Sequence, residues 1–96
     1  MADTLTNLGA AYGNLGDQAK KRDFLERALA IEERAFGRDL TVAIILWNLA
    51  EVHEELGDTV KQRELLERAL AINERAHGPD HSETTNCREW LAKLAT

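Results

Sequence analysis

The chain contains one sequence unit twice, and this internal repeat limits its fold more than any other feature. Leu5 to Gly37 aligns with Leu46 to Gly78 after a shift of 41 residues, with identity at 19 of 33 positions. The run Leu-Glu-Arg-Ala-Leu-Ala-Ile occurs unchanged at 25–31 and at 66–72. Chance does not produce seven consecutive identities inside a longer match, so the two units should share one structure. Self-similarity at a fixed period is typical of repeat architectures.

Each unit predicts two antiparallel helices joined by a tight turn. In the second unit Leu46, Leu49 and His53 recur at helical spacing. Gly57 then favours a helix end, and Asp58 is a good N-cap for the helix that follows. The first unit has the same plan. The sequence predicts five helices and no strand, over residues 4–15, 18–36, 41–56, 59–77 and 82–95.

The last predicted helix closes the second unit. Cys87, Trp90, Leu91 and Leu94 form one apolar stripe, which can cover the open side of that unit. Asp80 stands three residues before Glu83, which is the spacing of a capping box, so we expect Asp80 to cap this helix. The expected fold is all-α, in a single domain over residues 1–96. It comprises repeat 1 at 4–37, repeat 2 at 41–78 and the closing helix at 82–95.

Charge and composition exclude several classes of function. The net charge is −5 at pH 7, so the chain as a whole is not attracted to nucleic acid or to anionic membranes. The N-terminus has no basic start followed by an apolar run, and no apolar run is long enough to cross a bilayer. A single cysteine, Cys87, allows no disulfide within the chain. A cytoplasmic location is the expectation.

The first helix of each unit carries a recognisable pattern. The order Leu5-x-x-Leu8-Gly9-x-x-Tyr12 resembles the W-x-x-L-G-x-x-Y pattern of tetratricopeptide repeats, and 46–53 has the same order. The units are longer than the usual repeat of about 34 residues. Their extra Glu-Arg-Ala-x-Gly-x-Asp segment resembles the long repeats of kinesin light chains and nephrocystin-like proteins. The resemblance implies an α-solenoid that binds other proteins. Lys21 and Gln62 depart from it, because the family usually has a small alanine there; their side chains should reach past the helix contact, or the crossing should be looser.

The resemblance also implies a concave groove lined by the first helix of each unit. Trp47 stands out, because it lies off the packing stripe of its helix and so is available as an apolar anchor with an acidic rim. The alternative is that Trp47 packs against the closing helix. The expected lining comprises Thr6, Ala10, Gly13 and Asn14, then Ile44, Trp47, Glu51, Glu54 and Glu55, then Asn86, Glu89 and Lys93.

Two asparagines occupy equivalent positions in the two units. Asn7 and Asn48 resemble an asparagine ladder that holds a peptide backbone in some members of the family, because an amide offers both a donor and an acceptor. A local hydrogen bond between helices is the alternative. The candidate peptide-binding residues are therefore Asn7, Trp47, Asn48, Glu51, Glu54 and Glu55.

No pattern in the chain indicates catalysis, a cofactor or a metal. His77 and His81 have a spacing that could hold zinc on a helix, but Gly78 and Pro79 break the helix between them, so we expect the geometry to be lost. His53 takes the place of a packing tyrosine and should be partly buried. Cys87 should be a small core residue. The chain is not expected to be an enzyme.

These observations predict a protein–protein interaction module. The partner should be a protein or peptide that is basic and carries an apolar anchor, because Glu51, Glu54 and Glu55 face only Lys93 across the expected groove. The alternative is a structural spacer within a longer repeat array, or a scaffold that self-associates through the exposed faces of its terminal helices into a homo-oligomer and has no peptide ligand.

Overall fold

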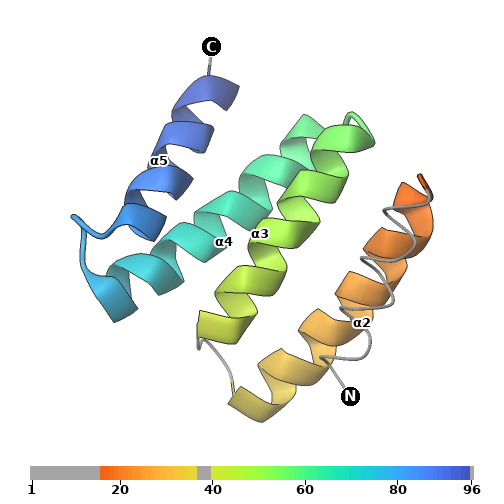
Figure 1. Cartoon of the computed structure of the whole chain (residues 1–96), viewed down its shortest axis with the longest axis horizontal. Helices are drawn as coiled ribbons and strands as arrows, with labels where there is room; N and C mark the ends of the chain where they lie inside the picture. The colour runs from red at the N-terminus through yellow and green to blue at the C-terminus, as the bar shows by residue number, and fades with distance from the viewer. Residues whose placement is uncertain (1–15, 37–39, 96) are drawn as a thin grey trace.

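A computed structural model describes residues 16–36 and 40–95, and these residues form four α-helices and no strand. The helices are α2 (Gln18–Phe36), α3 (Leu40–Glu55), α4 (Thr59–His77) and α5 (Ser82–Leu94). Each helix runs back alongside the one before it, so the four form an antiparallel row (Figure 1). Contacts join α2 to α3, α3 to α4 and α4 to α5. This arrangement is an α-helical repeat stack.

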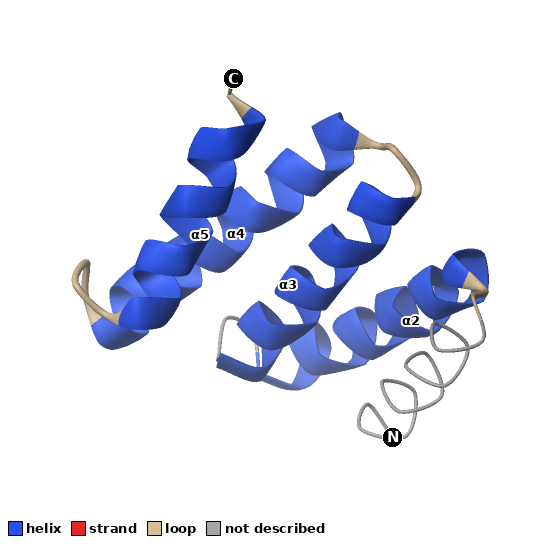
Figure 2. Cartoon of the chain, turned by 45° about the horizontal axis from the view of Figure 1, so that its top comes forward, coloured by secondary structure: helices blue, strands red, loops and turns tan. Residues whose placement is uncertain are grey.

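The four observed helices match four of the five predicted ones, with ends that differ by one residue at most. The fifth predicted helix, over residues 4–15, lies outside the described residues. Short loops join α3 to α4 and α4 to α5 (Figure 2). None of the described helices has the length and apolar character needed to cross a membrane.

The sequence determines the helix ends through the same two residue types in both units. Asp17 and Asp58 each accept a hydrogen bond from a backbone N–H three residues later, at 3.1 Å, so both serve as N-caps. Gly57 has φ 78°, a left-handed conformation that favours glycine over residues with a Cβ. The predictions for Gly57 and for both aspartates are confirmed.

The core is built mainly from α3 and α4. Leu46, Leu49 and Leu66 are almost fully buried. Burial of a leucine side chain contributes roughly 1.5–3 kcal/mol relative to leaving it exposed. The buried apolar residues of the described chain are Leu25, Ala28 and Leu29 of α2, Val42, Ala43, Ile45, Leu46, Leu49, Ala50 and Val52 of α3, Leu65, Leu66, Ala69 and Ile72 of α4, and Cys87 of α5.

The predicted cap of the last helix is wrong, and one of the two alternatives for Gln62 is excluded. The N-cap of α5 is His81, whose Nδ1 accepts a hydrogen bond from the backbone N–H of Glu83 at 3.2 Å. Asp80 is not the cap, because α5 begins at Ser82 and the residue immediately before it takes that position. Gln62 does not reach past the helix contact; its side chain is buried at 2% exposure. Lys21 is half-buried.

Candidate binding groove between α3 and α5

The two tryptophans of the chain meet where α3 and α5 face each other. The rings of Trp47 and Trp90 lie 4.7 Å apart between centroids, at an interplanar angle of 61°. This is an edge-to-face arrangement, which is favourable because the positive edge of one ring meets the negative face of the other. Both side chains are half-buried, so they join the two helices and still present apolar surface to solvent.

A hollow of about 260 Å³ lies on one side of this tryptophan pair. It extends from Trp47 toward the start of α5, and Ile44 is 56% exposed at its edge. Such an exposed branched apolar side chain next to an indole offers a contact surface for an apolar group. The lining residues are Ala43, Ile44, Trp47, Asn73, Glu83 and Asn86.

A second hollow, of about 400 Å³, is lined by both tryptophans and shares Trp47 and Asn86 with the first. The two hollows therefore adjoin each other, and we call them together the α3–α5 groove. The second hollow is lined by Trp47, Glu51, Glu54, Asn86, Glu89, Trp90 and Lys93.

The α3–α5 groove is apolar in the middle and acidic at its edges. Glu51 and Glu54 on α3 and Glu89 on α5 surround the second hollow, and Glu83 lies at the far end of the first. Among the described lining residues, Lys93 is the one cation. The excess of carboxylates gives the groove a negative potential, which attracts cationic ligands and repels anionic ones.

Comparison with known protein families identifies the architecture. The model of the tetratricopeptide repeat matches residues 1–61 and, in a second overlapping match, residues 41–95. The chain belongs to the tetratricopeptide repeat family. No curated protein matches the chain. The match to the family model confirms the predicted resemblance to the family. Tetratricopeptide repeats are generally modules for protein interaction.

The structure brings some of the predicted site residues of this tetratricopeptide repeat protein together. Trp47, Glu51 and Glu54 line the second hollow. Glu55 is exposed and Asn48 is half-buried, and neither lines either hollow. Asn7 lies outside the described residues, as do Thr6, Ala10, Gly13 and Asn14. That the candidate residues bind a peptide remains a prediction.

Both alternatives for Trp47 describe part of what is observed, because it lines the groove and also packs against α5. Sequence reasoning missed the contribution of Trp90, which was assigned to the covering stripe of α5. A signal was present: Trp90 lies one helical turn after Asn86 and one turn before Lys93, and both of these were expected on the groove side. The ring is large enough to serve the core and the groove at once.

The turn between α4 and α5 contains a second group of side chains that lie close together. Gly78 and Pro79 end α4 as expected, yet the turn does not separate His77 from His81. The two imidazole rings stack at 3.9 Å between centroids with an interplanar angle of 14°. The helical i,i+4 geometry is lost at Gly78 and Pro79 as expected, but the short loop folds His81 back over the end of α4 and brings the two rings together.

The remaining reactive side chains are held in the core. Burial raises the pKa of the Cys87 thiol, and the Asn73 side chain, which lies 3.6 Å from its sulfur, opposes this only in part. A thiol with a raised pKa is a poor nucleophile at neutral pH. His53 is buried between α2, α3 and α4, and burial lowers its pKa, against the opposing influence of Asp58. Both residues therefore have the structural environments that the sequence analysis expected.

Proposed function

We propose that this tetratricopeptide repeat protein binds a segment of a partner protein in the α3–α5 groove. The segment is basic and inserts an apolar side chain beside Trp47. The observation that supports this proposal is the contact of Trp47, which lines two adjoining hollows, with Trp90, together with the glutamates that line both hollows. A rigid aromatic anchor in a partly desolvated hollow, surrounded by polar groups, is the usual arrangement of a binding hot spot.

The apolar part of the groove determines affinity. Trp47 is held in place by the edge-to-face contact with Trp90, so little conformational freedom is lost when a ligand side chain packs against it. Ile44 extends the apolar surface toward the start of α5. Contacts at such an anchor contribute about 2 kcal/mol or more to binding.

The acidic edges determine which ligands approach. Glu51, Glu54 and Glu89 favour lysine or arginine on the ligand, and an arginine guanidinium can also stack on an indole face. Charges at the edge of an interface change the association rate and the salt dependence more than the final affinity. Salt should therefore weaken binding by slowing association.

The experiment is a peptide-array screen at two salt concentrations, followed by fluorescence titration of the hits. Both tryptophans of the chain line the groove, so intrinsic fluorescence reports on this site directly. We expect basic-apolar hits that weaken as salt rises. Trp47→Ala should weaken binding by at least roughly 30-fold, which corresponds to the loss of about 2 kcal/mol.

A charge variant tests the acidic edge without disturbing the packing of the indoles. Replacing Glu51 and Glu54 with glutamine should weaken binding about fivefold, or by roughly 1 kcal/mol. The matched control replaces Glu64 and Glu67 of α4, which are exposed and do not line the groove. Acidic hits, or hits indifferent to Trp47, would place the binding surface elsewhere. A screen without hits would favour a structural spacer or a self-associating scaffold.

A further inference from the structure

The turn from α4 to α5 is fixed in place by several interactions. Gly78 has φ 86°, and its N–H donates to the backbone oxygen of Glu74 at 2.9 Å. Arg88 of α5 donates to the backbone oxygen of Pro79 at 2.8 Å and lies 3.4 Å from the Glu74 carboxylate. One side chain therefore joins the end of α4, the turn and α5. The residues at either end of this turn, His77 and His81, are held close together as a result.

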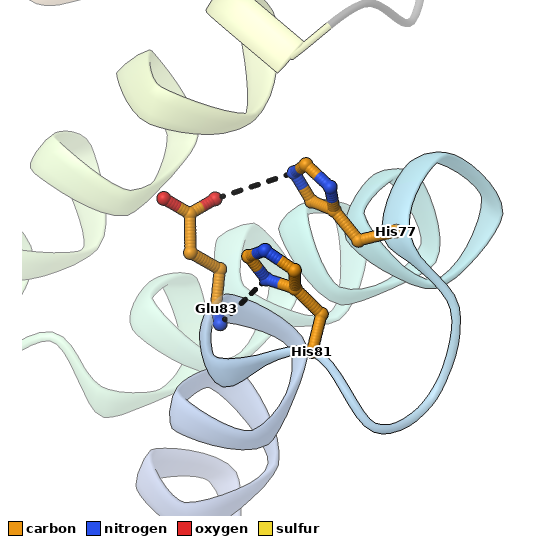
Figure 3. Close-up of side chains that lie close together, drawn as sticks. All are labelled: His77, His81 and Glu83. Carbon is orange, nitrogen blue, oxygen red and sulfur yellow. Dashed lines mark hydrogen bonds and ion pairs between the residues drawn. The ribbon is translucent and has the colours of Figure 1, made fainter.

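Three side chains that can bind a metal ion converge at this turn (Figure 3). The stacked rings of His77 and His81 contribute nitrogen, and Glu83 contributes a carboxylate 3.7 Å from Nε2 of His77. One potential ligand atom from each of the three residues lies within 4.8 Å of the other two. The three belong to the end of α4, the turn and the first turn of α5, so the fold assembles them without any long-range adjustment.

We propose that His77, His81 and Glu83 form a binding site for Zn²⁺. Two imidazole nitrogens and one carboxylate oxygen suit this borderline-soft ion, whereas Mg²⁺ and Ca²⁺ prefer sites made of oxygen. Three protein ligands leave the fourth tetrahedral position to water. Two zinc ligands at roughly 2.0–2.2 Å from the ion are separated by about 3.4 Å in a tetrahedral site. The 3.7 Å between His77 and Glu83 is close to that separation.

Zinc binding requires one ring to turn. The lone pair of an imidazole nitrogen lies in the plane of its ring, so two nearly parallel rings 3.9 Å apart cannot both point at one ion. His81 is exposed, whereas the side chain of His77 is only 25% exposed. His81 is therefore the ring that turns. The other two ligands need only small adjustments.

The same movement couples the metal to the start of α5. Nδ1 of His81 accepts the Glu83 N–H in the structure, so the neutral ring carries its proton on Nε2. Coordination through Nε2 moves that proton to Nδ1, and coordination through Nδ1 displaces the N–H directly. In both cases the hydrogen bond from the Glu83 N–H to Nδ1 is lost. The Glu83 amide should therefore report zinc binding even though it is not a ligand.

The test is calorimetric titration of the whole chain with Zn²⁺, combined with NMR of the histidine ring nitrogens and of the Glu83 amide. We expect binding of one ion, with shifts for His77, His81 and the Glu83 amide. The third histidine, His53, is an internal reference, because it is buried between α2, α3 and α4. Equal shifts at His53, or no shift at the Glu83 amide, would contradict the site.

Two variants separate coordination from helix stability. His81→Asn removes the imidazole but retains a residue that caps helices well, and Glu83→Gln removes the charge while keeping the backbone N–H. Each should weaken Zn²⁺ binding by more than roughly 10–100-fold, because loss of an outer-shell partner already costs that much. The matched control is Glu67→Gln, which makes the same change of charge in the middle of α4. Circular dichroism would verify that helix content is retained, and unchanged affinity in the two folded variants would overturn the proposal.

Discussion

His53 shows how a single substitution in a repeat makes stability depend on pH. Its side chain is 6% exposed, and among the described residues neither ring nitrogen has a hydrogen-bond partner. Nδ1 lies 4.0 Å from the Asp58 carboxylate, at the margin of an ion pair. Burial disfavours the charged imidazolium and so lowers the pKa of His53, while Asp58 opposes this only in part.

The lowered pKa predicts the direction of the effect. Between the pKa of folded His53 and the unfolded value of about 6.5, the unfolded chain binds more protons, so stability rises with pH. The contribution is fully present above about pH 6.5 and is lost as pH falls toward the pKa of the folded state. Urea denaturation between about pH 5 and pH 8 would measure it.

The matched variant for this measurement is His53→Tyr, because Tyr12 occupies the equivalent position of the first unit. His53 borders a hollow of about 270 Å³, which has room for the larger ring and its hydroxyl. We expect the variant to have a flatter stability profile than the wild-type chain across this pH range. Equal slopes in the two proteins would show that other groups produce the pH dependence.

Gln62 is a second residue that departs from the family pattern, which usually has a small alanine at this position. Its side chain is buried in α4, and Nε2 has no hydrogen-bond partner among the described residues. A buried donor left unpaired costs about 1–3 kcal/mol. Gln62→Met keeps a similar unbranched shape without the amide, so we expect the free energy of unfolding to rise by about 1 kcal/mol in urea denaturation. A free energy of unfolding below that of the unsubstituted chain would contradict this expectation. It would indicate that the contacts of the amide oxygen stabilise the fold by more than the unpaired amide nitrogen destabilises it.

Among the secondary-structure elements, the described helices could be predicted from the sequence, but some of their caps could not. Helix ends could be predicted because Gly57 with Asp58, and Asp17 in the first unit, act through local backbone geometry. The His81 cap could not be predicted, because histidine is not a usual N-cap and its ring accepts only in one tautomer. Arg68 shows the same limit: its spacing from Glu64 favours an i,i+4 ion pair within α4, but the structure pairs it with Glu33 of α2 at 2.9 Å.

The closing helix α5 should be essential for stability. It packs against α4, buries Cys87 and contributes Trp90, Leu91 and Leu94 to the margin of the core. Truncation after His81 would remove these contacts and the edge-to-face partner of Trp47. We expect the loss of a large fraction of a total stability on the order of 5 kcal/mol. An unchanged denaturation midpoint for the truncated chain would show that α5 is dispensable.

At the scale of the whole molecule, the groove was predictable in position but not in detail. The resemblance to tetratricopeptide repeats implied that Trp47, Glu51 and Glu54 line the groove, and their helical spacing is consistent with one face of α3. The contact between Trp47 and Trp90 depends on how closely α3 and α5 approach, and this distance follows from packing across α4. The stacking of His77 on His81 likewise depends on the path of the turn rather than on local spacing.

The linear order of contacts predicts how the molecule opens. The main contacts of each described helix are with its neighbours in the row, with the Trp47–Trp90 contact joining α3 to α5. α3 supplies more of the buried apolar residues than any other described helix. In such stacks stability is approximately a sum of the units and their nearest-neighbour interfaces, so the ends open before the middle. We expect native-state hydrogen exchange to be slowest in α3 and α4 and faster in α5.

Paired substitutions would test this order directly. Leu49→Ala removes a fully buried side chain of α3, at a cost of roughly 2–5 kcal/mol, and should accelerate exchange in every helix. Trp90→Ala removes the half-buried ring of α5 and its contact with Trp47, and should accelerate exchange mainly in α5. If both variants instead accelerated hydrogen exchange in all described helices by the same factor, the chain would open as one cooperative unit. The α4–α5 interface would then be too strong to separate before the core opens.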